Sequence, residues 1–455
     1  MPRPRALLIP VAVCAAAAGV YLWSGPAPAP VEPAAAPPAD APPIPVRPDS
    51  EAPYRPYQYQ LTTDQSIKVF EGRVRDDPNH LNLTHLGGLY VRKARESGDH
   101  SGYDRADAAF RRALDVLPNH GPARVGLALV TTARHKFADG LKLAEVVYRD
   151  DPAALDALAV IVDARLELGD YDGAERAVRE LEAKAAKPAP PGVRVLAARL
   201  AELRGDPGRA IDLLQQAADA QTPGSDLKES QAWYRMRLGE LLLSVGRLDE
   251  AAARFEAALR DHPDYPAALG LLARVRAAQG RDADAIELCE KAARITPEVA
   301  TLALAGDLRM KRGEVGVAGL FYGAVEQADA DPVGSRDLVL YYCDHDKKLP
   351  RALELAEAEA KARRDVYTCD SLAWALLRNG RLADAERVAA DALRLGTKDA
   401  LLLYHAGAIA LAAGKPEQAS ALFERALAAN PHFSDRYAAD ARRHLADAAA
   451  RPGRR

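Results

Sequence analysis

The chain has 455 residues, of which 48% are hydrophobic and 27% are charged, so it has a globular composition and is long enough for several domains. Its 61 Lys and Arg residues nearly balance its 64 Asp and Glu residues, and the net charge of −3 offers no basic surface for nucleic acid. Aromatic residues make up only 6%, and Ala and Leu are abundant. Small and unbranched residues in this proportion favour helices over sheets.

The N-terminus predicts a membrane anchor. Ala6 to Trp23 carries no charge and follows Arg3 and Arg5. As a helix this segment is about 27 Å long, enough to cross a bilayer, and the arginines would remain on the cytoplasmic side. The alternative is a signal peptide that is cleaved after small residues such as Ala16 to Ala18. Either outcome places the rest of the chain outside the cytoplasm.

Residues 24–57 are rich in Pro and Ala and show no helical period, which is typical of an extended spacer. The four cysteines show no ligand spacing, so we expect neither a disulfide framework nor a metal site from them. Cys14 lies in the anchor segment behind Val13, where lipidation would require a small residue.

From about residue 62 the chain repeats itself. One alanine recurs at intervals of 33 to 41 residues, a glycine usually stands five residues before it, and a proline often stands twelve residues after it. The alanines are Ala174, Ala210, Ala251, Ala285, Ala318, Ala352, Ala385 and Ala419. A period of this length indicates stacked helical units that bury a shared core.

Residues 232–265 show one unit clearly. Gly246 ends a first helix, because only glycine enters the left-handed region without a steric penalty. A second helix follows with Ala251 and Phe255 on its buried face, and Pro263 ends it. Small residues at Gly239 and Ala251 would allow the two helices to approach closely.

These features resemble the tetratricopeptide repeat family. The matching residues are Leu238, Gly239, Leu242, Ala251, Phe255 and Pro263, with similar sets in residues 266–299 and 400–433. The resemblance extends over residues 62–433. It implies an all-α, right-handed α-solenoid of about ten helix-turn-helix units, whose concave groove binds a peptide or partner helix.

The predicted organisation follows from these segments. We assign residues 1–23 to the anchor or signal segment, 24–57 to the linker, 58–217 to an N-terminal array, and 218–231 to a longer loop that divides the array. Residues 232–433 form a C-terminal array, and 434–455 form a capping helix and tail. The polar capping helix would solvate the end of the solenoid.

No catalytic motif stands out. The chain contains no Gly-rich phosphate loop, no GxSxG and no HExxH, so we predict no enzyme activity, no cofactor and no metal. Asp344-His345-Asp346 is the best candidate for acid–base or metal chemistry, but its position between two helices favours a polar turn.

The groove supplies the candidate binding residues. At the central inward position, Asp163, Arg199, Glu240, Arg274 and Asp307 alternate in sign, which favours pairing between neighbouring helices over a ligand surface. The last units instead offer an aromatic and acidic group, formed by Asp337, Tyr341, Tyr367, Asp370, Trp374 and Tyr404. It would suit a peptide with apolar and basic side chains, or its rings would pack between adjacent first helices.

The sequence therefore predicts a scaffold for protein–protein interaction, tethered to the inner or plasma membrane by residues 6–23, that faces the periplasm or cell exterior in a cell-envelope assembly. A secreted or periplasmic peptide-binding protein and the regulatory subunit of an envelope enzyme are the alternatives. The partner is a protein or peptide, and no nucleic acid is expected.

Overall fold

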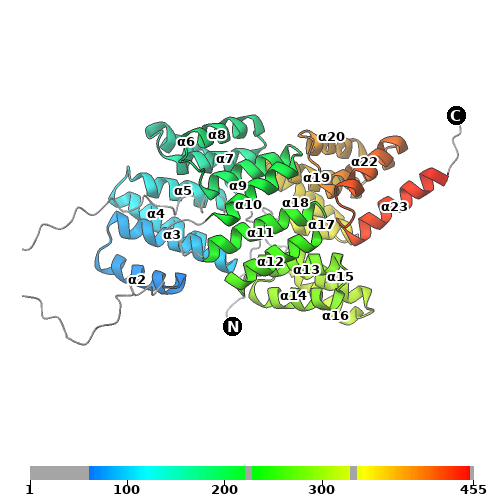
Figure 1. Cartoon of the computed structure of the whole chain (residues 1–455), viewed down its shortest axis with the longest axis horizontal. Coiled ribbons are helices and arrows are strands. Elements are labelled where there is room, and N and C mark those ends of the chain that lie inside the picture. Colours follow the sequence, from blue (N-terminus) through cyan, green and yellow to red (C-terminus); the bar gives the residue numbers. More distant parts are fainter. Residues whose placement is uncertain (1–60, 221–227, 328–335, 451–455) are drawn as a thin grey trace, which may run out of the picture.

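The computed structural model of the chain describes residues 61–220, 228–327 and 336–450, which form 22 helices and no strand (Figure 1). The first half comprises α2 (Thr63–Asp76), α3 (His80–Ser97), α4 (Ser101–Val116), α5 (Gly121–Ala133), α6 (Phe137–Asp150), α7 (Leu155–Leu168), α8 (Tyr171–Lys184), α9 (Pro191–Leu203), α10 (Pro207–Asp219), α11 (Lys228–Ser244) and α12 (Leu248–Asp261). The second half comprises α13 (Pro266–Ala278), α14 (Asp282–Ile295), α15 (Val299–Lys311), α16 (Val315–Gln327), α17 (Arg336–Asp344), α18 (Leu349–Ala362), α19 (Val366–Arg378), α20 (Leu382–Leu393), α21 (Ala400–Ala412), α22 (Pro416–Ala429) and α23 (Asp435–Ala450).

The helices pair into ten consecutive units, from α3–α4 to α21–α22, with α2 before them and α23 after them. The predicted all-α solenoid is thus confirmed. Glycine allows the two helices of a unit to approach: a Cβ on Gly239 would lie 2.8 Å from the ring of Phe255, and one on Gly407 would lie 2.7 Å from the ring of Phe423. The small residues of the repeat therefore make room for the large ring of the second helix.

Each first helix ends in a turn with a left-handed residue. Gly169, Gly205 and Gly246 hold this place with φ of 76°, 73° and 77°, where a residue with a Cβ is strained. Asp346 takes the place of glycine in the unit formed by α17 and α18, with φ of 53°. The turns that the sequence assigned to glycine are therefore the points where the chain reverses.

The apolar core runs between the layers of helices. One cluster of buried side chains extends from Ile67 to Val275, and it includes both Ala218 and Trp233. The core is therefore continuous on either side of the loop that was expected to divide the solenoid. Residues 221–227 lie outside the described part of the chain, and the division into two arrays stays a prediction.

The solenoid curls far enough that its later units pack on its earlier ones. The Thr296 hydroxyl donates to the Ser97 carbonyl at 2.9 Å, and the Val366 amide donates to the Tyr171 hydroxyl at 2.8 Å. The Asn430 side chain donates to the Leu243 carbonyl at 2.9 Å. These partners are 187 to 199 residues apart in the sequence. We call this interface the seam: loops between later units lie on the turns within earlier units.

The seam follows from the chemistry of helix ends. The last carbonyls of a helix have no partner within it, so they accept hydrogen bonds from outside. At the end of α7 the Arg364 amide donates to the Glu167 carbonyl at 3.1 Å, and the Arg394 side chain donates to the Gly169 carbonyl at 3.1 Å. Loops of the later units therefore supply donors to first helices of the earlier units.

A buried ionic network crosses the seam. Arg363 lies 2.8 Å from a carboxylate oxygen of Glu167, 2.6 Å from one of Glu359 and 3.6 Å from one of Asp365. All four side chains are 6% exposed or less. Arg363 is shared by three buried carboxylates, and Arg199 also pairs with Glu167, so this network holds the two turns of the solenoid together.

Within the described ranges, no helix is both long and apolar enough to cross a bilayer. The anchor expected at residues 6–23 lies outside these ranges.

Candidate binding cavity

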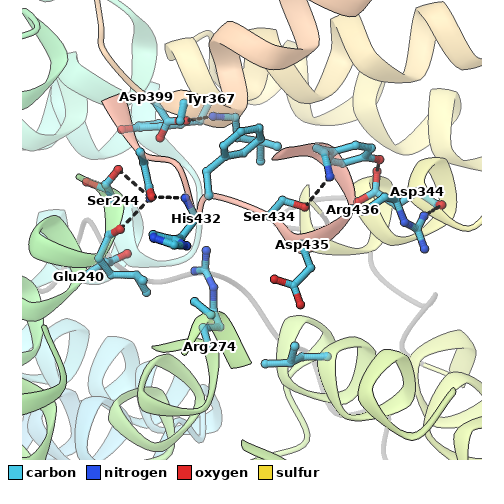
Figure 2. Close-up of a pocket in the computed structure, with 18 of the residues that line it drawn as sticks. Glu240, Ser244, Arg274, Asp344, Tyr367, Asp399, His432, Ser434, Asp435 and Arg436 are labelled. Carbon is cyan, nitrogen blue, oxygen red and sulfur yellow. Dashed lines mark hydrogen bonds between the residues drawn. The ribbon is translucent and has the colours of Figure 1, made fainter. Parts of the chain in front are cut away.

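The inner faces of the first helices enclose a cavity of about 820 Å³ (Figure 2). Five consecutive first helices, α7, α9, α11, α13 and α15, supply one wall. The loops that lead into α19, α21 and α23, together with the start of α23, supply much of the other. Since those loops also form the seam, the curling of the solenoid is what converts an open groove into a cavity. Its volume lies within the range of small-molecule pockets, about 300 to 1,000 Å³.

One end of the cavity is acidic. Glu202 of α9, Glu240 of α11 and Asp399 at the start of α21 line it together with the ring of Tyr367. The pKa of Glu202 is raised to about 7, mainly by burial, with Arg237 opposing the shift and Glu240 and Asp399 adding to it. Arg336 lies over the Tyr367 ring at 5.4 Å. This end therefore favours a cationic or hydrogen-donating group.

Replacing Glu202 with Gln should remove a pH dependence of stability. Because the folded-state pKa lies above the ordinary value of 4.5, the folded protein binds more protons between pH 4.5 and 7, and wild-type stability falls as the pH rises through this window. The variant lacks this loss, so its free energy of unfolding relative to wild type should rise by on the order of 1 kcal/mol between pH 5 and 8. Urea unfolding at both pH values measures it, with Glu417→Gln on the exposed surface as control. If the unfolding free energy of the variant relative to wild type is the same at pH 5 and pH 8, the raised pKa of Glu202 is contradicted.

Arg274 of α13 extends into the cavity from the opposite side to Asp399, and Figure 2 shows its guanidinium aimed at the open space near His432 and Asp435. It is exposed and forms no hydrogen bond or ion pair within the described residues. An exposed guanidinium without a partner on an inner wall is available to a carboxylate or carbonyl of a ligand.

The other members of the alternating series are paired. Arg199 lies 2.7 Å from Asp163 of the neighbouring first helix, which confirms the predicted pairing between helices there. Glu240 pairs with Arg237 of its own helix, and Asp307 accepts hydrogen bonds from Tyr322 and His345 at 2.7 Å each. Arg274 is thus the member of the series that the fold leaves available.

Comparisons with known proteins agree with the repeat. A family model described as tetratricopeptide repeat matches residues 160–226, 236–300 and 371–432. The chain is 29% identical over 202 residues, or 43% of its length, to a TPR repeat-containing protein of Pseudomonas aeruginosa. These three segments are tetratricopeptide repeats.

Other similarities to known proteins are more distant. The chain is 24% identical over 307 residues, 67% of its length, to cellulose synthase 1 operon protein C of Komagataeibacter xylinus. The alignments span only 32% and 19% of the lengths of these two relatives. Among solved structures, the chain is similar to the APC/C assembly Cut9–Hcn1, with 14% identity, a TM-score of 0.33 and coverage of 84% of this chain and 93% of that one. It is also similar to the type IV pilus biogenesis factor PilW, with 18% identity, a TM-score of 0.36 and coverage of 46% and 90%.

Four of the six residues expected in the aromatic and acidic group lie inside the tetratricopeptide array. Tyr341, Trp374, Tyr404 and Asp370 are 3% to 5% exposed. The ring of Trp374 stacks on His405 at 4.2 Å. The interpretation in which the rings pack between adjacent first helices accounts for these four residues.

The capping helix α23 explains this burial. Its Tyr437 ring stacks on Tyr404 at 4.6 Å, and its Asp440 accepts a hydrogen bond from the Tyr404 hydroxyl at 2.7 Å. The capping helix therefore covers the rings of Tyr404 and Trp374, whereas the ring of Tyr341 packs with Tyr322 and His345. Of the remaining two, Tyr367 lines the cavity and Asp337 is half-buried, so their role in binding stays a prediction.

Asp344-His345-Asp346 forms structural contacts. Asp344 accepts a hydrogen bond from Trp374 Nε1 at 3.0 Å, His345 Nε2 lies 2.7 Å from Asp307, and Asp346 pairs with Arg378. Across the described ranges, no group of three or more His, Cys, Asp or Glu side chains is arranged to hold a metal ion. Each residue of the motif thus has a partner from a neighbouring tetratricopeptide helix.

Sequence reasoning did not identify His432, Asp435 and Arg436 as cavity residues. They lie at the entrance to the capping helix, beyond the last repeat proline, so the repeat register does not assign them to an inner face. One local signal was present, since the start of a helix places its first side chains and amides beside whatever it faces.

Proposed function

We propose that this tetratricopeptide protein is an extracytoplasmic, membrane-tethered scaffold of a cell-envelope assembly, and that it holds a peptide segment of its partner in the cavity. The tetratricopeptide repeats support a scaffold for protein–protein interaction. The observation that carries the cavity as the binding site is the unpartnered guanidinium of Arg274, facing an acidic end formed by Glu202 and Asp399.

The charge arrangement favours a peptide that carries both signs. An acidic side chain or terminal carboxylate would pair with Arg274, and a basic side chain would reach Glu202. Between these ends the wall is partly apolar, with Leu203, Leu243 and Leu308.

The location rests on the N-terminal sequence. An uncharged segment, Ala6 to Trp23, behind Arg3 and Arg5 supports a membrane tether that leaves the repeats outside the cytoplasm. The name of one relative refers to a cellulose synthase operon, which is consistent with work at an envelope. A secreted form after cleavage, or a regulatory subunit of an envelope enzyme, would use the same cavity.

Selection of peptides from a random library on the full-length protein tests the binding site. We expect the selected peptides to carry an acidic group, and their affinity for Arg274→Glu to fall at least about tenfold, since a hydrogen bond to a charged group contributes about 1.5 to 3 kcal/mol. The control is Arg260→Glu, an exposed arginine at the end of α12 outside the cavity.

Equal losses in both variants would indicate a general charge effect and would reject the cavity. Location is measured separately, by the accessibility of the repeats to protease in intact cells and in cells with a permeabilised outer layer. Repeats that resist protease until the inner membrane is broken would overturn the extracytoplasmic placement while leaving peptide binding intact.

A further inference from the structure

The seam uses only half of the turns that the repeat produces. At Gly98, Gly169 and Gly205 an added Cβ would meet atoms of residues 296, 364 and 396 within 3.2 Å, because later loops cover these turns. The corresponding turns of the later units, at Gly280, Gly313, Gly380 and Gly414, have no described atom within 4 Å of an added Cβ. These turns have the same backbone as the covered ones and lack the covering loop.

The loops show the reverse pattern. In the later units the residues that enter the seam are buried: Thr296 is 7% exposed, Thr397 2% and Asn430 2%. In the earlier units the equivalent loop after α4 is open, with Val116 52% exposed and Leu117 41% exposed. Leu117 stands directly before Pro118 as Thr296 stands directly before Pro297. The turns and the loops that meet in the seam therefore both recur elsewhere on the molecule without a covering partner.

Both uncovered halves carry exposed apolar side chains. Beside Gly313, helix α16 exposes Val315 at 61%, Val317 at 39% and Leu320 at 75%, and Leu320 is the most exposed large apolar residue of the described chain. Most other second helices carry a charged residue at the position of Leu320, such as Glu287, Glu354 and Arg387, and the rest carry alanine. A solvated position that is charged or small elsewhere and carries a large apolar side chain here indicates a covered surface.

Charge is also compatible. Val315 to Val325 contains no charged residue, while Lys311 and Arg312 stand before Gly313 and Asp115 stands before Val116. Lys311 and Arg312 already pair with Asp282 and Glu314 at 2.8 and 2.9 Å. Such exposed pairs contribute little and exchange partners at low cost. A loop with an acidic neighbour therefore suits a turn with basic neighbours.

We propose that a second copy of this chain docks head to tail, with its loop surface (Leu81, Val116 and Leu117) on the turn surface (Gly313, Val315, Val317 and Leu320) of the first. This contact between two molecules repeats the packing that the seam makes within one molecule. The two surfaces differ, so the interface is heterologous and produces a ring or an open chain of copies. This assembly is independent of the cavity and of its ligand.

Cross-linking between two differently tagged full-length copies tests the proposal. One copy carries Leu117→Cys and the other carries Leu320→Cys, both with Cys14→Ser. The remaining cysteines, Cys289, Cys343 and Cys369, are buried. The control replaces Leu117→Cys with Leu143→Cys, an apolar residue of α6 that is 37% exposed and belongs to neither surface. A short bismaleimide is applied to cells that express both copies.

We expect a cross-link between positions 117 and 320 with at least fivefold the yield of the pair 143 and 320. Single-site labelling with a monomaleimide and an unchanged helical spectrum first establish that each cysteine is accessible and each variant is folded. With those established, absence of the cross-link overturns the proposal. A cross-link between two copies of position 320 that exceeds the mixed one overturns it as well, since it would indicate a symmetric interface through α16.

Discussion

Replacing Arg363 with alanine is expected to destabilise the protein by about 3 to 5 kcal/mol, because removing one partner of a buried ionic network leaves uncompensated charge. Arg363 is 4% exposed and lies against Glu167, Glu359 and Asp365, which are 1% to 6% exposed. Without the guanidinium, Glu359 and Asp365 lose this cation and Glu167 keeps Arg199, so buried carboxylates must take up protons or draw water into the seam. The midpoint of urea unfolding, followed by circular dichroism, measures the effect.

The neighbouring arginine provides the matched control. Arg364 is 53% exposed and pairs with Asp391 at 3.3 Å on the surface, while its contact to the seam is made by its backbone amide and survives the substitution. Arg364→Ala should change the unfolding free energy by no more than about 0.5 kcal/mol. If the two variants lose equal stability, the network does not hold the seam. If only Arg363→Ala loses stability, small-angle scattering should also show a more extended particle for this variant.

The repeat could be read from the sequence because its signals are local. The interval between Ala251 and Ala285, the glycine five residues before each and the ring of Phe255 all concern residues that lie within one unit or its neighbour. Helix ends, pairing and the capping helix follow from that local pattern. The curvature of the array depends instead on the sum of many small rotations between units, which no single residue encodes.

The seam and the cavity were not predictable for that reason. Thr296 meets Ser97 across 199 residues. Thr296, Arg363 and Asn430 hold the same place in the repeat, but they share no residue type that would mark them as seam residues. They are loop residues, which are polar in most proteins. Burial of Arg363 is the feature that distinguishes it from Arg364, and burial is known only once the turns of the solenoid meet.

The aromatic group illustrates the same limit. The register placed Tyr341, Trp374 and Tyr404 on one side of the first helices. The structure shows Trp374 and Tyr404 packed with Tyr437, while the ring of Tyr341 packs with Tyr322 and His345. The capping helix was expected to be polar, yet its Tyr437 is 8% exposed because that face meets the last unit. A solenoid end must cover its last apolar face, so aromatic residues near that end have a structural use that competes with ligand binding.

Replacing Gly205 with alanine should open the seam, because an added Cβ would lie 2.3 Å from the carbonyl oxygen of Gly396 and backbone must move to relieve the contact. Part of any loss arises from φ of 73°, which costs a residue with a Cβ roughly 1 to 2 kcal/mol. The variant Gly414→Ala measures this backbone cost alone, since φ of Gly414 is 74° and no described atom lies within 4 Å of an added Cβ.

We therefore expect Gly205→Ala to be less stable than Gly414→Ala by at least about 1 kcal/mol in urea unfolding, in the range of strain from overpacking. Amide hydrogen exchange should also rise at residues 396–399 in Gly205→Ala and stay unchanged there in Gly414→Ala. Since the loop at Asp399 lines the acidic end of the cavity, the same variant should weaken peptide binding without altering any residue that faces the ligand. Equal stability and equal exchange in the two variants would show that the later units do not rest on the earlier ones at this turn, and the cavity would then be an open groove.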